Sequence, residues 1–209
     1  MVRKFMVMVA VASLSCAAFG QNLFQNPGFE TGDFSGWTIS ATANGLSNPP
    51  ETVAYYDIDG SGPLGSSLAA QFGVGQVSPQ SGVFCGMEMT QYLSLIAGES
   101  YTFDFDLSVE RISTQTNING GTFDLIIDGS PIASWTAGQI GGSAGSNKYY
   151  HMNANYIPSA SGNYMVGLRI TRQYTSPGNI SQFVDNCSLV PEPASLSLLL
   201  LGLLALRRR

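Results

Sequence analysis

The stretch Tyr101-Thr-Phe-Asp-Phe-Asp-Leu-Ser-Val109 alternates apolar and polar side chains at every position. Successive side chains of a β-strand point to opposite faces of its sheet, so a strand here carries its aromatic and aliphatic residues on one face. The other face carries Thr102, Asp104, Asp106 and Ser108. This pattern is typical of an antiparallel sheet that packs one face on a core and leaves the other in water. It therefore predicts a two-faced strand over residues 101–109.

Similar signals recur along the chain between residues 37 and 190. Residues 164–170 alternate in the same way, and residues 123–127 lead through Asp128-Gly129 into residues 131–135, which is the pattern of a β-hairpin. The other expected strands, rich in β-branched and aromatic residues, are 37–40, 53–58, 68–72, 83–89, 92–95, 149–157 and 183–190. No stretch of this region keeps apolar residues at helical spacing. The sequence predicts an all-β fold, an antiparallel β-sandwich of the jelly-roll type.

Composition and charge agree with one folded domain and exclude nucleic acid as a partner. Of the 209 residues, 44% are hydrophobic and 11% aromatic, which is more than a disordered chain carries. Residues 21–190, the length of one domain, hold thirteen carboxylates and four cations, Arg111, Lys148, Arg169 and Arg172. A formal charge of −9 with scattered cations offers no basic patch to a phosphate backbone.

The first twenty residues have the pattern of a secretory signal peptide. Arg3-Lys4 precedes an apolar run at 5–14, and the small residues Ala18 and Gly20 stand at positions −3 and −1 of a signal-peptidase site. We therefore expect the mature chain to begin near Gln21 and to be exported.

A lipoprotein leader is the alternative for the same segment. Cys16 would carry the lipid if cleavage came directly before it. Ser13, however, stands where the lipobox of such leaders normally has leucine. The signal-peptide interpretation is preferred for this reason.

Residues 191–209 differ from the domain in composition. Pro191-Glu192-Pro193 is followed by a leucine-rich run at 196–206 and then by three arginines. At about 1.5 Å per residue, a helix of that length spans less than roughly 20 Å, short of the roughly 30 Å hydrocarbon core of a bilayer. We therefore expect the segment to contact the inner membrane only transiently, with its arginines on the cytoplasmic side.

The three parts of this tail resemble the PEP-CTERM sorting signal of Gram-negative bacteria. Besides the leucine run, the residues that carry the resemblance are Pro191, Glu192, Pro193, Arg207, Arg208 and Arg209. The resemblance implies that an exosortase-like sorting enzyme recognises the tail and that the tail is removed. It implies a final location at the cell envelope, the cell surface or the extracellular matrix. The alternative is a helix packed on the domain, but the leucine run lacks the polar face of such a helix.

A second resemblance is anchored at both ends of the domain. Asn26-Pro-Gly-Phe-Glu30 is followed closely by Gly36-Trp37, and the last expected strand has the sequence Phe183-Val-Asp-Asn-Cys-Ser-Leu-Val190. These stretches resemble the galactose-binding-like jelly rolls of carbohydrate-binding modules, with Cys187 where such strands usually carry valine. The resemblance implies a carbohydrate ligand, such as an extracellular polysaccharide.

The same resemblance implies a structural calcium ion held by Glu30 and Asp185. In such modules the opening glutamate and the aspartate of the closing strand commonly help to bind the ion. Calcium takes six to eight hard oxygen ligands, including carboxylates and backbone carbonyls. The alternative has no metal, with Glu30 capping a turn and Asp185 marking a β-bulge.

Aromatic side chains that point outward from a sheet are candidates for stacking on sugar rings. Trp135, Tyr149 and Tyr150 flank the glycine-rich loop at 138–147 and are the candidate ligand-binding residues. Because Tyr149 and Tyr150 are adjacent on an expected strand, one of them should face outward. Core packing is the alternative role for each of the three.

Few residues of the domain suit catalysis. His151 is the single histidine, and Gly141-Gly-Ser-Ala-Gly145 fits the G-x-S-x-G nucleophile pattern without the helix that must follow it. Asp104 and Asp106 share one strand face at roughly 6–7 Å, a spacing close to that of glycosidase carboxylates. The sequence favours a non-enzymatic binding or structural protein, with a secreted glycan hydrolase or lyase as the alternative.

Two cysteines remain after removal of the signal peptide, Cys85 and Cys187. Export to an oxidising compartment permits a disulfide bond between them. The alternative is that both are small buried hydrophobic residues.

The tail should be dispensable for folding, because its leucine run is separated from the last expected strand by two prolines. We predict that a chain shortened to end at Val190 keeps the β-sheet circular dichroism and the cooperative melting of the full-length protein. It should also escape into the medium instead of being retained at the envelope. Aggregation or unfolding of the shortened chain would show that the tail belongs to the core.

Overall fold

The computed structural model describes residues 20–58, 67–78, 80, 83–173 and 179–192. The predicted signal peptide, apart from Gly20, and the predicted sorting tail from Pro193 onward lie outside the described residues. Within the described part, no helix is long and apolar enough to cross a membrane.

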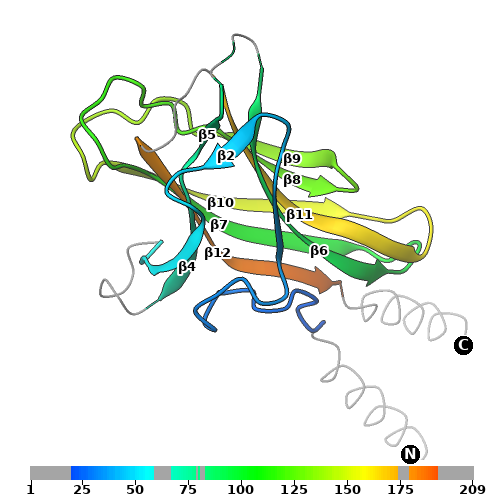
Figure 1. Ribbon diagram of the computed structural model, residues 1–209. Helices are drawn as coiled ribbons and strands as arrows, with labels where there is room; N and C mark the ends of the chain where they lie inside the picture. Colours follow the sequence, from blue (N-terminus) through cyan, green and yellow to red (C-terminus); the bar gives the residue numbers. More distant parts are fainter. Residues whose placement is uncertain (1–19, 59–66, 79, 81–82, 174–178, 193–209) are drawn as a thin grey trace, which may run out of the picture.

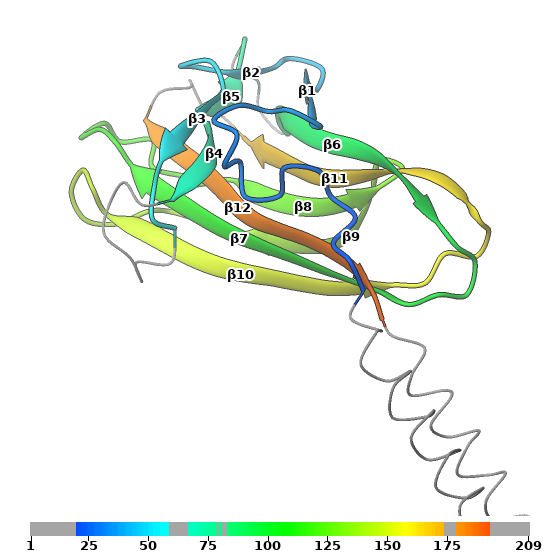
Figure 2. The same ribbon diagram turned by 90° about the horizontal axis from the view of Figure 1, so that it is seen from below.

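Ten of the strands form two antiparallel five-stranded sheets that face each other (Figure 1; Figure 2). In spatial order, the first sheet consists of β1 (Thr38–Ala41), β6 (Cys85–Leu95), β11 (Gly162–Arg172), β8 (Thr122–Ile127) and β9 (Ser130–Thr136). The second sheet consists of β10 (Asn147–Tyr156), β7 (Tyr101–Arg111), β12 (Ile180–Pro191), β4 (Leu68–Phe72) and β3 (Thr52–Tyr55). A small separate pair consists of β2 (Gly45–Ser47) and β5 (Val74–Gln76).

From β6 onward the chain passes repeatedly between the sheets. β6, the hairpin β8-β9 and β11 belong to the first sheet, whereas β7, β10 and β12 belong to the second. This crossing pattern makes the β-sandwich a jelly roll. The predicted fold class is confirmed.

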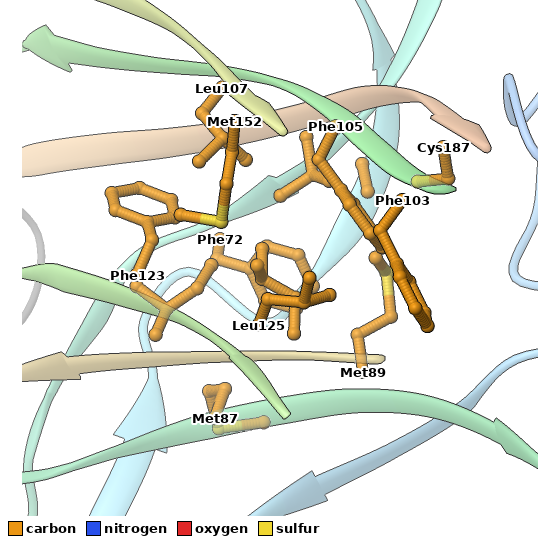
Figure 3. Close-up of a cluster of buried hydrophobic side chains, with 14 of the residues drawn as sticks. Phe72, Met87, Met89, Phe103, Phe105, Leu107, Phe123, Leu125, Met152 and Cys187 are labelled. Carbon is orange, nitrogen blue, oxygen red and sulfur yellow. The ribbon is translucent and has the colours of Figure 1, made fainter. Parts of the chain in front are cut away.

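Alternating side chains of both sheets build the core, as the stretch at 101–109 predicted. The inward residues of β7, from Tyr101 to Val109, are all buried. Figure 3 shows Phe103, Phe105 and Leu107 of β7 facing Met89 of β6 and Leu125 of β8. Removing each such side chain from water contributes about 1.5–3 kcal/mol to folding, so the core is the main stabilising element.

One strand is longer than the sequence predicted. The expected strands 83–89 and 92–95 are a single strand, β6, which continues through Thr90 and Gln91. Gln91 is buried, and its side chain has two partners: it accepts the backbone N–H of Gln25 at 3.0 Å and donates to the backbone carbonyl of Gln25 at 2.7 Å. Partners distant in sequence thus satisfy a polar side chain that would otherwise interrupt the strand.

The N-terminal segment 20–37 lies along β12 (Figure 2). The N–H of Leu23 donates to the carbonyl of Leu189, and the N–H of Cys187 donates to the carbonyl of Pro27, both at 2.9 Å. Phe24 stacks on Trp37 with ring centroids 4.9 Å apart. The two stretches that carry the carbohydrate-binding-module resemblance therefore lie side by side.

The last strand continues one residue beyond the expected strand 183–190, because β12 ends at Pro191. Pro191 still pairs with Tyr101 of β7, and the N–H of Glu192 donates to the carbonyl of Ser100 at 2.8 Å. A chain that ends at Glu192 therefore keeps every described contact of β12, and it is the matched second variant for the truncation at Val190.

Candidate functional site

The two predicted calcium ligands lie close together in the structure. Asp185 is 1% exposed, and its carboxylate accepts the Ser67 hydroxyl at 3.1 Å and the N–H of Asn186 at 2.7 Å. Glu30 accepts the N–H of Leu68 at 3.3 Å, so both carboxylates reach the start of β4. The strand register shifts directly after Asp185, which is the β-bulge of the metal-free alternative. The bulge of the metal-free alternative is therefore present, but the hydrogen-bond partner of Glu30 is Leu68 and not the turn that the same alternative had Glu30 cap.

The charges around Asp185 favour a cation. Burial is the main cause that raises the pKa of the Asp185 carboxyl to about 6; the negative charges of Glu30 and Asp106 act in the same direction, and the hydrogen bonds from Asn186 and Ser67 act against it. A divalent cation would offset both the burial and the repulsion. No group of three or more His, Cys, Asp or Glu residues in the described part of the chain is arranged for a metal ion. Backbone and hydroxyl oxygens would therefore have to complete a calcium shell.

The three predicted sugar-stacking residues do not form one platform. Trp135 of β9 stacks on Tyr150 of β10 with centroids 5.0 Å apart and planes 10° apart, and it also packs on Phe123. Because β9 and β10 are edge strands of different sheets, this stack closes the open edge of the sandwich. Tyr149 points to the opposite face, where its hydroxyl donates to Asp106 at 2.8 Å. Trp135 and Tyr150 thus pack on each other, although Tyr150 is still 39% exposed, and their ligand-binding role stays a prediction.

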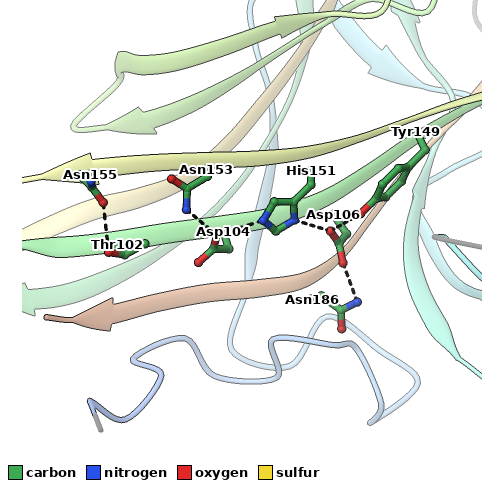
Figure 4. Close-up of polar contacts among 8 residues, drawn as sticks. All are labelled: Thr102, Asp104, Asp106, Tyr149, His151, Asn153, Asn155 and Asn186. Carbon is green, nitrogen blue, oxygen red and sulfur yellow. Dashed lines mark hydrogen bonds and ion pairs between the residues drawn. The ribbon is translucent and has the colours of Figure 1, made fainter. Parts of the chain in front are cut away.

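A row of polar side chains runs along the neighbouring strands β10 and β7 on the outer face of the second sheet (Figure 4). We call it the His151 row; its members are Asp104, Asp106, Tyr149, His151, Asn153 and Asn186. The imidazole bridges the two carboxylates, with Nδ1 2.8 Å from Asp106 and Nε2 3.2 Å from Asp104. Asn153 donates to Asp104 at 2.6 Å, and Asn186 donates to Asp106 at 2.8 Å.

This geometry bears on the enzymatic alternative. Asp104 and Asp106 share a face, as predicted, but a single imidazole lies between them and both already accept hydrogen bonds from amides. Ser143 lies in a turn in which its carbonyl accepts the N–H of Ser146, and the chain continues into the strand β10. The strand-turn-helix elbow that a G-x-S-x-G nucleophile needs is therefore absent from this part of the described chain.

A hollow on the outer face of the first sheet was not foreseen from the sequence. Its volume is about 550 Å³, and its lining residues are Thr42, Phe84, Glu88, Thr122, Asp124, Arg169 and Thr171. Strand register explains the grouping: Arg169 of β11 pairs with Glu88 of β6 on one side and with Asp124 of β8 on the other. Thr171, the next residue of β11 on the same face as Arg169, pairs with Thr122 of β8.

The hollow combines one aromatic side chain, that of Phe84, with polar and charged groups. Phe84 is 60% exposed, directly before β6. The Arg169 guanidinium donates through Nε and Nη2 to one oxygen of Glu88, at 2.7 and 2.6 Å. Ser134 donates to Asp124. Phe84 is the single apolar side chain among these lining residues, which otherwise carry carboxylates, hydroxyls and one guanidinium.

The two cysteines are free and buried, so the structure contains no disulfide between them. Cys85 begins β6 beside Arg172 of the first sheet, whereas Cys187 lies at the bulge of β12 in the second sheet. Burial raises the pKa of the Cys187 thiol well above its usual value, which makes it unreactive. Both have the role of small buried hydrophobic residues, which was the alternative to the disulfide.

No protein-family model matches this sequence, and neither does any curated protein. Solved structures with similar strand arrangements include TmCBM61 in complex with β-1,4-galactotriose, at 17% identity over 82% of this chain and 99% of the other, with a TM-score of 0.49. A CBM22-1 xylan-binding domain from Paenibacillus barcinonensis Xyn10C aligns at 13% identity, 85% and 99% coverage and a TM-score of 0.44. The Stig cyclase Fisc from Fischerella sp. TAU aligns at 16% identity over 85% of this chain and 99% of the other, with a TM-score of 0.49. Likenesses at this level assign neither a ligand nor an enzymatic class to this chain.

The His151 row gives a pH-dependent prediction. The hydrogen bond to Asp106 raises the pKa of His151, and the charges of Asp106 and Asp104 add to this against partial burial. A raised pKa in the folded state stabilises the protein at low pH, and this stability is lost as pH rises through the folded value. Because His151 is the single histidine, its NMR titration is unambiguous. We expect a pKa above 6.5 that falls in Asp106→Asn; an unchanged pKa in that variant would contradict the geometry.

Proposed function

We propose that this chain is an exported, non-enzymatic protein that binds a polysaccharide in the hollow on the outer face of the first sheet. The observation that carries the proposal is the union of the exposed Phe84 ring with the Glu88, Asp124 and Arg169 side chains in one open hollow. Ordered polar groups beside an exposed ring match the two kinds of surface that a sugar presents.

Each part of the hollow has a counterpart on a pyranose ring. The C–H face of the sugar would stack on Phe84, which is one of the lining residues of the hollow. The sugar hydroxyls would donate to the carboxylates of Glu88 and Asp124 and exchange hydrogen bonds with the threonine hydroxyls. Arg169 and Glu88 already hold each other through two short contacts, so little entropy of these two side chains would be lost on binding.

Export and surface location form the second part of the proposal. The signal-peptide pattern and the resemblance of residues 191–209 to a PEP-CTERM signal support delivery to the envelope or the extracellular matrix of a Gram-negative bacterium. An exosortase-like enzyme would be the partner of the tail. The domain itself would then contact the polysaccharide outside the cell.

The alternative function is a glycan hydrolase or lyase that uses Asp104 and Asp106. Their bridging by His151 favours a structural role for the pair. Release of reducing ends or of unsaturated products from a glycan panel, abolished in Asp106→Asn, would establish the enzymatic alternative. Such activity would also displace the non-enzymatic proposal.

Binding in the hollow predicts a specific effect of removing its ring. Phe84→Ala should weaken the affinity for a glycan that the wild-type protein binds about three- to tenfold, on the order of 1 kcal/mol, because the stacking surface is lost. Tyr55→Ala is the matched control, since Tyr55 is 71% exposed on β3 of the other sheet. Isothermal titration calorimetry measures both. Equal affinities of the two variants would place the ligand elsewhere.

We also propose that Glu30 and Asp185 hold a structural calcium ion, which would tie the N-terminal segment to β12. At one hundred times its dissociation constant the ion would stabilise the domain by about 2.7 kcal/mol. We expect millimolar calcium to raise the melting temperature relative to a chelator, and we expect Asp185→Asn to lose this response. Glu51→Gln, a carboxylate away from the site, should keep it. Identical melting curves of the wild type with calcium and with chelator would refute the ion.

A further inference from the structure

The charge of the hollow selects among polysaccharides. We propose that it accepts chains without acidic groups, whether neutral or amine-bearing, and excludes polyuronates and sulfated chains. This inference rests on the proposed function, since it names the class of ligand that the same hollow would take.

Arg169 is the single cation among the lining residues, and Glu88 neutralises it. Its Nε and Nη2 both donate to Glu88, and Nη2 also donates to the carbonyl of Gly129 at 3.2 Å. A guanidinium held in this way by a carboxylate on the neighbouring strand is not presented as a fork to an incoming carboxylate. To pair with the Nε and Nη2 side of Arg169, an acidic sugar would have to displace Glu88 and leave that carboxylate without its partner.

Asp124 leaves the hollow with a net negative charge. It lies on the opposite side of Arg169 from Glu88, and its contact with Ser134 is to a neutral hydroxyl. The hollow therefore holds two carboxylates and one guanidinium. A carboxylate or sulfate on the ligand would meet repulsion here, whereas a sugar amine would meet an unbalanced negative charge.

The remaining cations of the domain do not correct this balance. Arg111 donates to the carbonyls of Ser113 and Gly142, Lys148 donates to the carbonyl of Ala137, and Arg172 is buried. None of the three lines the hollow. With a formal charge of −9 over residues 21–190, the surrounding field also repels polyanions at low salt.

Isothermal titration calorimetry with soluble oligomers of four glycans tests the inference: galactan, xylan, glucosamine chains and polygalacturonate. The wild-type protein should bind a neutral or amine-bearing class at least about tenfold more tightly than polygalacturonate. Binding of the amine-bearing class should weaken with salt and in Asp124→Asn, whereas neutral binding should be insensitive to salt. Glu88→Gln combined with Asp124→Asn leaves Arg169 as the sole charge of the hollow, and this variant should gain affinity for polygalacturonate.

Glu51→Gln combined with Glu110→Gln is the matched control, because it removes the same charge outside the hollow. An equal gain in this control would show that only the overall charge matters and would overturn the assignment to the hollow. Wild-type binding of polygalacturonate as tight as that of the other classes, and weakened in Phe84→Ala, would overturn the charge selection but support the proposed function. Absence of binding to every class, with circular dichroism showing a folded domain, would overturn both.

Discussion

The interleaving of side chains from two facing sheets is the constraint on which the rest of this structure depends. In β7 the inward residues Phe103, Phe105 and Leu107 are buried, so Asp104 and Asp106, which alternate with them, lie on the outer face. β11 obeys the same rule with Leu168 inside and Arg169 outside. Because nearly every strand gives one face to the core, polar chemistry is confined to the outer faces and to places where the alternation breaks.

The bulge of β12 is the clearest break. At this point the N-terminal segment lies against β12, and the register shifts between Asp185 and Ser188. Asn186 adopts a φ of 48° there and donates to Asp106, while Cys187 turns into the core. The bulge thus keeps the buried carboxylate of Asp185 close to Glu30, which is the basis of the calcium proposal.

The sequence predicted strands and turns, which depend on the local pattern of residues. It did not predict which residues of different strands come together, because that depends on how the strands pair. The alternation at 101–109 and the Asp128-Gly129 turn predicted strands and a hairpin that are present. The hollow was missed because Glu88, Asp124 and Arg169 are polar residues of three separate strands, and only the pairing of β6, β11 and β8 brings them together. The stacking of Trp135 on Tyr150 was also missed, because nothing in the sequence shows that edge strands of different sheets place the two rings face to face.

The central claim is that the outer face of the first sheet, and not the His151 row, binds the glycan. Chemical-shift mapping of the ¹⁵N-labelled protein during titration with the tightest-binding oligosaccharide tests it most directly, with the Arg169 Nε resonance as a side-chain probe. The account predicts shifts confined to β6, β8, β11 and the residues around Phe84. Shifts concentrated on β7 and β10, with Arg169 unperturbed, would contradict it.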